Sequence, residues 1–467
     1  MSRKSLYLAS ASLAAAIALA SAASASEHVN QRPEEPAVPA VQDVIVVTGF
    51  RITTNVTIEE HVSPEQAPLL GPDAASLVAR LPGAALVDNG SISGQVQYRG
   101  LFGPRAPVAI DGAAVASGGP NLMDPPLHYA PMPLVERIEV DRGVAAVSRG
   151  PGMGGGMNVI LKGVDFASGH EIEYEAETMA SVRSVDGSYA VGGVAGGASE
   201  SRRFQLLFSR EEGGDIAFSG GDIPNSHHER TVYGLGGGLA SGDHAVSLDY
   251  RRLDTGPTGN AALAMDIEHV ETDVARLAYE GMAGDIAIDA ALGWTDVSHG
   301  MDNFSQRPNP DPMRHRYTVA TANTVSAELT VGFAALGGDL ELGIDREEAE
   351  HDVLISNPNN AAFFLGSLPD ISIERTGAYA QWEGVILSLE SELGIRADWH
   401  SDDAGLARTG AAVPAGAQML AGMFNMADRA HDDTTVDAVA RFWRHTDGPL
   451  TWRLTLAHKT RMPSYVE

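Results

Sequence analysis

The chain has 467 residues with 32 Lys and Arg against 61 Asp and Glu, a formal net charge of −29, and it contains no Cys. This acidity argues against nucleic acid as a partner, because phosphate binding needs a clustered positive surface. The absence of Cys excludes a disulfide framework, thiolate zinc sites, iron–sulfur clusters and thiol catalysis. The length indicates two or more structural units.

The first 25 residues have the pattern of a bacterial secretory signal peptide. Arg3 and Lys4 precede a mostly apolar stretch over residues 6–22, and Ala23-Ser24-Ala25 offers a small-residue cleavage site. These flanks fit cleavage better than a membrane anchor. No later stretch has about 18 consecutive apolar residues, so no helix is expected to span a membrane. A membrane-embedded form of this chain would therefore be a barrel.

Residues 26–50 form the next predicted segment, a flexible leader. Three prolines and several charges over residues 26–42 favour a disordered tether. A short run rich in β-branched residues follows it: Asp43, Val44, Ile45, Val46, Val47 and Thr48. This run is either the first strand of the next domain or a docking strand that adds to the sheet of a partner.

Residues 51–165 have a mixed α/β pattern. Apolar spacing predicts a helix over residues 73–81, with Asp73 as its N-cap and Pro82-Gly83 ending it. Asp111-Gly112 predicts a tight turn. Strands are predicted around residues 96–99, 108–110, 135–140 and 159–161. A Gly-rich segment over residues 150–156 lacks the Lys-Ser/Thr ending of a phosphate-binding loop, so that role is not expected.

From residue 166 onward, apolar and polar residues alternate with period two. About 13 strand-like segments follow, several close to 9–11 residues long and often bounded by Trp or Tyr. Long connectors over residues 211–228, 253–271 and 401–429 alternate with short ones. This pattern is typical of a transmembrane β-barrel, although a soluble β-sandwich or solenoid also alternates.

The first half of the chain resembles the TonB-dependent outer-membrane receptor family. Six segments carry the resemblance in the family's order: 43–48 as the TonB box, Leu81-Pro82-Gly83, Arg99-Gly100, Ile110-Asp111-Gly112, residues 133–143 (PLVERIEVDRG), and Gly150 with residues 154–160 (GGGMNVI). The resemblance implies a mainly β fold in which an N-terminal α/β plug domain lies inside a transmembrane antiparallel β-barrel of 22 strands. Residues 51–165 would be the plug. Residues 166–467 would be a partial barrel, so the chain looks truncated at its C-terminus.

The same resemblance implies active uptake across the outer membrane of a Gram-negative bacterium. The partners would be TonB with its inner-membrane energising complex, an external ligand and outer-membrane lipid. The chain would not be an enzyme, and no catalytic constellation is visible in the sequence. No permanently bound cofactor is expected.

Two segments resemble the copper-receptor branch of the family: residues 123–129 (MDPPLHY) and residues 299–304 (HGMDNF). The resemblance implies that Met123, His299 and Met301 bind a copper ion as the transported ligand, brought free or by a carrier. The residue types suit this role, because thioethers are soft ligands for Cu(I) and imidazole also binds copper well. His299 and Met301 are two residues apart, so on a strand they share one face.

One position departs from that branch, which often carries a further sulfur residue four positions before the methionine of the first segment. Here that position is Gly119, so a fourth ligand would come from elsewhere, and His128 and Met132 are possible further ligands. Core packing is the expected role of Met153, Met157 and Met265. Met419, Met423 and Met426 have helical spacing, which predicts a packed or loop helix rather than a second copper site.

Two other functions compete with copper uptake. One is a TonB-dependent receptor for a siderophore or another metal chelate, although aromatic residues make up only 6% of the chain. The other is a surface binding or adhesion β-protein without transport.

Overall fold

The computed structural model describes residues 58–66, 71–119, 123–152, 156–445 and 451–464. The predicted signal peptide, the flexible leader and the segment Asp43 to Thr48 lie outside the described residues. The described chain is mostly β, with one four-residue and one twelve-residue α-helix, α2 (Ala75–Val78) and α3 (Ala415–Met426). No described helix is long and apolar enough to cross a membrane.

The N-terminal part is a small α/β unit, which we call the plug. Its main sheet has the order β1 (Ile58–Val62), β7 (Val135–Arg142), β8 (Met157–Leu161), β5 (Val108–Ile110) and β6 (Ala113–Ala114). A second sheet contains β2 (Ala84–Val87), β3 (Gln95–Tyr98) and β4 (Leu101–Phe102). Five 3₁₀ turns complete the plug: Pro64–Gln66, Gly103–Arg105, Pro126–Tyr129, Met132–Leu134 and Val147–Arg149.

Local sequence explains much of the plug. Asp111 and Gly112 both have positive φ, 51° and 81°, which the tight turn between β5 and β6 requires and which Asp and Gly tolerate. The helix predicted over residues 73–81 is shorter than expected, since α2 spans only Ala75–Val78. Asp73 still accepts a hydrogen bond from the backbone N–H of Ala75 at 2.9 Å, but its other oxygen binds the N–H of Gly94 at 2.6 Å. This second bond ties the helix start to a neighbouring loop.

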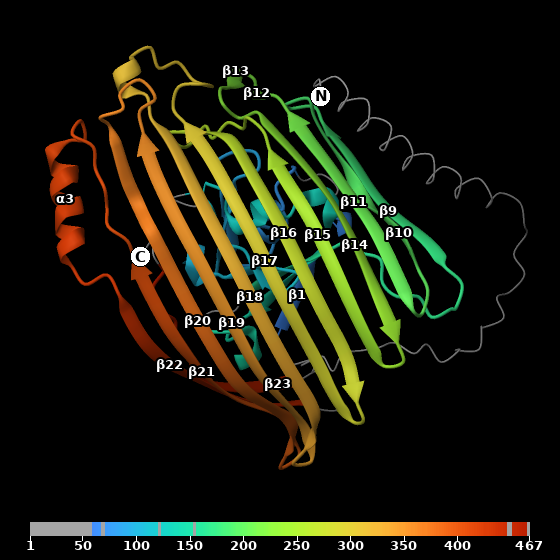
Figure 1. Cartoon of the computed structure of the whole chain (residues 1–467). Helices are drawn as coiled ribbons and strands as arrows, with labels where there is room; N and C mark the ends of the chain where they lie inside the picture. The colour runs from blue at the N-terminus through green and yellow to red at the C-terminus, as the bar shows by residue number, and fades with distance from the viewer. Residues whose placement is uncertain (1–57, 67–70, 120–122, 153–155, 446–450, 465–467) are drawn as a thin grey trace, which may run out of the picture.

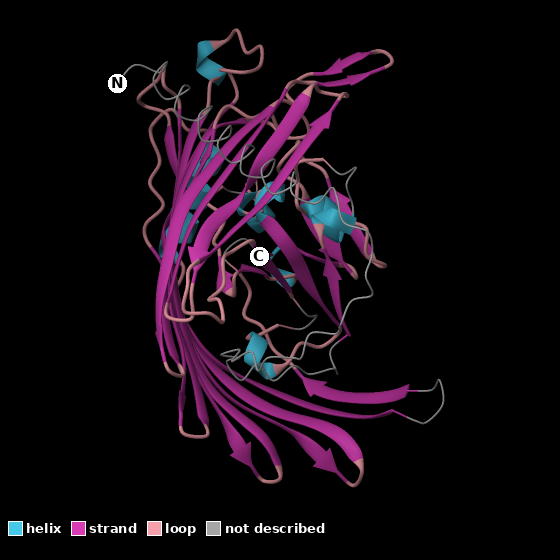
Figure 2. Ribbon diagram, turned by 90° about the vertical axis from the view of Figure 1, so that its right-hand side faces the viewer, coloured by secondary structure: helices cyan, strands magenta, loops and turns pink. Residues whose placement is uncertain are grey.

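The rest of the chain forms one antiparallel sheet of 13 strands, in which each strand pairs with its neighbours along the chain. Figure 2 shows it as a curved wall with the plug on its concave side. The strands in chain order are β9 (Glu173–Arg183), β10 (Ser188–Ala198), β11 (Arg202–Gly213), β14 (His228–Ser241), β15 (His244–Thr255), β16 (Asp266–Ala283), β17 (Ile286–Asp302), β18 (Tyr317–Ala335), β19 (Gly338–Ser356), β20 (Phe364–Ile386), β21 (Leu389–Ala404), β22 (His431–His445) and β23 (Thr451–His458).

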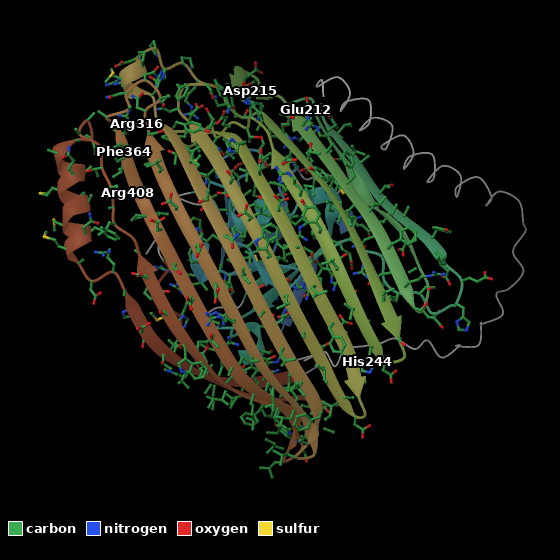
Figure 3. The ribbon with its side chains drawn as sticks, in the orientation of Figure 1. Glu212, Asp215, His244, Arg316, Phe364 and Arg408 are labelled. Carbon is green, nitrogen blue, oxygen red and sulfur yellow. The ribbon has the colours of Figure 1, made fainter. Side chains whose placement is uncertain are left out.

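The two ends of the wall differ in their connections (Figure 1). At one end, two-residue turns join β14 to β15, β16 to β17, β18 to β19 and β20 to β21. At the other end the connections are long. They include a hairpin of β12 (Ile216–Phe218) and β13 (Gly221–Ile223), a 3₁₀ turn at Pro312–Arg314, and α3. In Figure 3, Arg316, Phe364 and Arg408 mark the long-connector end, and His244 marks the short-turn end. The predicted alternation of long and short connectors is confirmed.

The wall has one apolar face turned away from the plug. Leu248, Leu277 and Leu292 lie directly opposite one another across β15, β16 and β17, and all three are exposed. On the alternate positions of β17, Thr295 and Val297 are buried. The period-two pattern in the sequence therefore separates an outer apolar face from an inner face that contacts the plug.

The structure confirms the helix predicted from the spacing of the methionines, which is α3. These methionines are exposed rather than packed. Met419, Met423 and Met426 are 62%, 55% and 82% exposed. Polar contacts hold the helix to its own connector, because the Asn425 side chain exchanges hydrogen bonds with the backbone of Ala407. The helix is a loop helix with an exposed apolar face.

The main apolar core lies between the plug and the wall. Plug residues such as Leu77, Leu134 and Ile138 share one buried cluster with Val232 and Ile267 of the wall. A buried ion pair reinforces this contact: Arg230 of β14 donates to Glu211 of β11 at 2.6 Å and to the backbone carbonyl of His128 at 2.6 Å.

Replacing Arg230 by Leu should destabilise the protein by about 3–5 kcal/mol, because it leaves the Glu211 carboxylate buried without its partner. Arg276→Leu is the matched control, since Arg276 pairs with Glu328 at a half-exposed site and should cost no more than about 1 kcal/mol. Thermal or urea unfolding in detergent measures both. Equal stability of the two variants would contradict this account of the plug–wall contact.

Candidate metal centre

Two described parts of the plug, residues 117–119 and residues 123–124, are joined by hydrogen bonds to one carboxylate, Asp124. Its two oxygens accept hydrogen bonds from the backbone N–H of Gly118 at 2.9 Å, the N–H of Gly119 at 2.7 Å and the Ser117 hydroxyl at 2.8 Å. The Tyr129 hydroxyl also donates to it. Asp124 is fully buried. These hydrogen bonds hold Gly118 and Gly119 against Asp124, the residue that follows Met123.

The wall meets these residues at the long-connector end of β17. His299 is fully buried there, and its Nδ1 lies 3.2 Å from Asp124 Oδ1. This contact with Asp124 engages Nδ1, and Nε2 has no hydrogen-bond partner among the described residues. A buried ring nitrogen without a hydrogen bond is costly, and a ligand at Nε2 would offset that cost.

The electrostatics of Asp124 fit a carboxylate that stays charged. Burial alone would raise its pKa, but the His299 imidazole and the hydrogen bond from Tyr129 hold the pKa of this carboxyl below its usual range. A carboxylate against one histidine nitrogen orients the ring and increases the basicity of the other nitrogen, as in many metal sites.

The thioethers come together beside this histidine. Met123 of the plug and Met301 of β17 belong to one small buried cluster with Ala320 of β18 and Val353 of β19. Met301 follows His299 by two residues on the same inner face, and both are fully buried. The structure therefore brings together Met123, His299 and Met301, which the sequence predicted as ligands.

Position 119 cannot supply a fourth ligand without rearrangement. A Cβ at Gly119 would lie 2.4 Å from Asp124 Oδ1 and 2.6 Å from His299 Nδ1, far inside van der Waals contact. The glycine is what allows this part of the plug to lie against the histidine ring.

His128 and Met132, the possible further ligands, lie elsewhere. His128 Nδ1 bonds the carbonyl of Ile92 at 3.0 Å and its Nε2 bonds the Thr255 hydroxyl at 2.9 Å. Burial and the nearby Arg230 guanidinium lower the pKa of His128 to about 4. Met132 packs in the main core between plug and wall. Both side chains serve that contact.

Sequence reasoning missed two parts of the centre. Asp124 was visible only as a member of the segment 123–129, and nothing in the sequence pairs it with His299, 175 positions away. His351 of β19 is buried, and it lies close enough to Asp124 for an electrostatic interaction. Only the strand order places it there. Among the described residues, no three His, Asp or Glu side chains form a group able to hold a metal, so a metal here depends on the thioethers.

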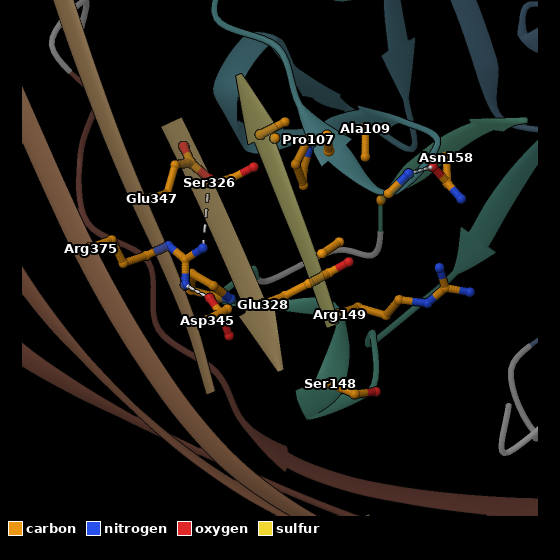
Figure 4. A pocket seen from close by; sticks show the side chains of 18 of the residues that line it. Pro107, Ala109, Ser148, Arg149, Asn158, Ser326, Glu328, Asp345, Glu347 and Arg375 are labelled. Atoms are coloured by element: carbon orange, nitrogen blue, oxygen red, sulfur yellow. Dashed lines mark hydrogen bonds and ion pairs between the residues drawn. The ribbon is translucent and has the colours of Figure 1, made fainter. Parts of the chain in front are cut away.

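A separate cavity of about 450 Å³ lies between the plug and the wall, nearer the short-turn end (Figure 4). It is lined by residues of plug strands β5 and β8 and by the inner face of β17 to β20. Three of its arginines are paired with carboxylates: Arg276 with Glu328 at 3.5 Å, Arg346 with Glu374 at 2.7 Å, and Arg375 with Asp345 and, at 3.6 Å, with Glu347. On β17, His299 lies six residues beyond Gly293 of this cavity, which is about 20 Å along a strand.

Known proteins resemble this chain in the sequence of its plug and in its fold. Residues 60–157 match the model described as TonB-dependent Receptor Plug Domain. No curated protein sequence matches the chain. Three solved structures are similar to it. The copper transporter OprC has a TM-score of 0.75 at 19% identity, over 88% of this chain and 66% of that one. The hemophore receptor HasR of Serratia marcescens has a TM-score of 0.67 at 16% identity, over 87% and 64%. The ferric yersiniabactin receptor FyuA of Yersinia pestis has a TM-score of 0.62 at 14% identity, over 86% and 64%.

These matches confirm the plug domain and the fold that the sequence predicted. Residues 60–157 are a plug domain of the TonB-dependent receptor family, and the described chain has the fold of the barrels in that family. The chain spans slightly less than two thirds of the length of these solved structures.

Proposed function

We propose that this chain belongs to a TonB-dependent receptor that takes up copper across the outer membrane of a Gram-negative bacterium. The observation that carries the proposal is the buried His299 imidazole, whose Nε2 has no hydrogen-bond partner among the described residues, two residues from Met301, which shares a buried cluster with Met123. Soft thioethers and imidazole together favour copper, and Cu(I) in particular, over harder cations.

The surface supports a membrane location. A row of exposed leucines crosses adjacent strands on the face turned away from the plug, where a soluble protein would carry polar residues. The long-connector end, which holds the centre, would then face outward as in barrels of this class.

The leader supplies the link to an energy source. We assign Asp43 to Thr48 as the TonB box, a strand that adds to the sheet of TonB in the periplasm. The inner-membrane complex of TonB would then drive release of the ion from the plug.

A siderophore is the competing transported ligand. An anionic chelate needs uncompensated positive charge, yet Arg375 in the cavity is paired with Asp345, Glu347 and Asp398. The cavity also has Tyr379 as its single aromatic side chain among the lining residues. This composition disfavours a siderophore site there.

Anaerobic titration of the purified protein in detergent tests the proposal, with a chromophoric Cu(I) chelator as competitor. We expect one Cu(I) per chain and no binding of ferric chelates. Binding of a ferric chelate without any binding of copper would overturn the copper assignment. Binding of copper without uptake by cells would favour a surface binding protein.

Replacing Asp124 by Asn should lower the affinity for Cu(I) by about 10- to 100-fold, the usual effect of removing a carboxylate that orients a ligand histidine. The amide also cannot accept all of the hydrogen bonds that Asp124 accepts. Asp285→Asn, in an exposed turn, is the control. An unchanged affinity in Asp124→Asn would show that the carboxylate has no part in the centre.

A further inference from the structure

The connector between β15 and β16 contributes side chains that pack against the thioether cluster. Two of its residues, Leu263 and Met265, are partly buried and pack against the cluster that contains Met123 and Met301. Core packing was the expected role of Met265. Its position adds a third thioether to the group.

The sulfur of Met265 is held on the inner side of the wall by a polar contact. The Thr318 hydroxyl donates to Met265 Sδ at 3.5 Å. Thr318 is buried and lies directly opposite Met301 in the register of β17 and β18. Residues opposite each other on antiparallel strands project from the same face, so Met265 Sδ lies on the Met301 side of the wall. A hydroxyl is a weak partner for a thioether, and a soft cation can replace it.

The backbone at Met265 is fixed by a neighbouring ion pair. Asp266, the next residue, is buried and accepts from Arg307 Nε at 2.7 Å and from the N–H of Asn260 at 2.9 Å. Arg307 also donates to the carbonyl of Leu263 at 2.9 Å. The connector is thereby clamped on both sides of Met265, so the thioether is positioned before any ligand arrives.

We propose that Met265 is the fourth ligand of the centre, giving three thioethers and one imidazole for a monovalent soft cation, Cu(I) or Ag(I). This inference rests on the proposed function. The Gly119 position is closed by His299 and Asp124, so a fourth ligand must come from another segment, and the Met265 sulfur lies on the Met301 side of the wall. Sulfur donors select monovalent copper over Zn²⁺ and other divalent ions that prefer nitrogen and oxygen.

Replacement of Met265 by Leu tests the inference, because Leu conserves volume and removes only the sulfur. With Ag(I) and Cu(I) as probes, we expect an affinity at least about 10-fold lower than in the unchanged protein. X-ray absorption of the copper-loaded protein should show one sulfur neighbour fewer. Met157→Leu is the matched control, since Met157 is buried in the main core away from the centre.

The outcomes separate this inference from the proposed function. If the unchanged protein binds neither ion, both fail. If it binds, and Met301→Leu weakens binding while Met265→Leu leaves both the affinity and the sulfur count unchanged, only the role of Met265 fails. Equal weakening in Met265→Leu and Met157→Leu, with the sulfur count unchanged, would also overturn it as an effect of packing.

Discussion

Deleting residues 43–48 should abolish copper accumulation by cells and leave the copper affinity of the purified protein unchanged. The segment runs Asp43, Val44, Ile45, Val46, Val47, Thr48, and its β-branched side chains suit a strand that adds to the sheet of a partner. Without this docking strand, the plug receives no energy from TonB. The ligand site lies between the plug and the wall and needs no part of the leader.

The measurement is accumulation of copper in cells that carry the deletion as the only form of the receptor. Deleting residues 30–35 of the same leader is the matched control, because it removes an equal length of chain and should leave uptake intact. Normal copper accumulation after loss of residues 43–48 would contradict energised transport through this segment.

Replacing His299 or Met301 by Ala should lower the affinity for Cu(I) by about 100-fold or more. Each change removes a donor atom, an effect at least as large as the loss of a residue that only orients a ligand. Both side chains are fully buried on the inner face of β17, so no neighbouring donor from solvent replaces them. Competition titration with a Cu(I) chelator measures the affinity.

Met419→Ala provides the control for this pair. Met419 is 62% exposed on α3, far from the plug in sequence and on a different connector, and its loss should leave the affinity unchanged. The account would be wrong if His299→Ala and Met301→Ala bound copper as tightly as Met419→Ala.

The features of the fold that the sequence predicts correctly are those set by local residue patterns. Asp111-Gly112 specifies its turn because the needed positive φ angles are available to those residues. The inner and outer faces of β17 follow from side-chain alternation, which depends on sequence alone. The helix near Asp73 is shorter than its spacing predicts and its N-cap is Ala74, while the Asp73 carboxylate accepts from Ala75 and from Gly94, the second a contact that depends on tertiary structure.

In the candidate centre, too, the sequence predicts some residues, and the tertiary structure determines the rest. Met123, His299 and Met301 stand in short segments with a family resemblance, so they were predicted by residue number. The contact between Asp124 and His299 and the position of Met265 depend on how the plug sits against the wall. His128 looked like a candidate from its nearness in sequence, yet its ring is used by Ile92 and Thr255. Nearness in sequence does not tell which side of a loop faces the wall.

The most direct test of the central claim is an anomalous difference map from crystals of the copper-loaded protein, measured at the copper edge. We predict one strong peak in contact with His299 and with the sulfur of Met301, between Met123 of the plug and the inner face of β17. Copper bound only elsewhere, or a loaded protein without a peak at these two side chains, would contradict the assignment of this centre.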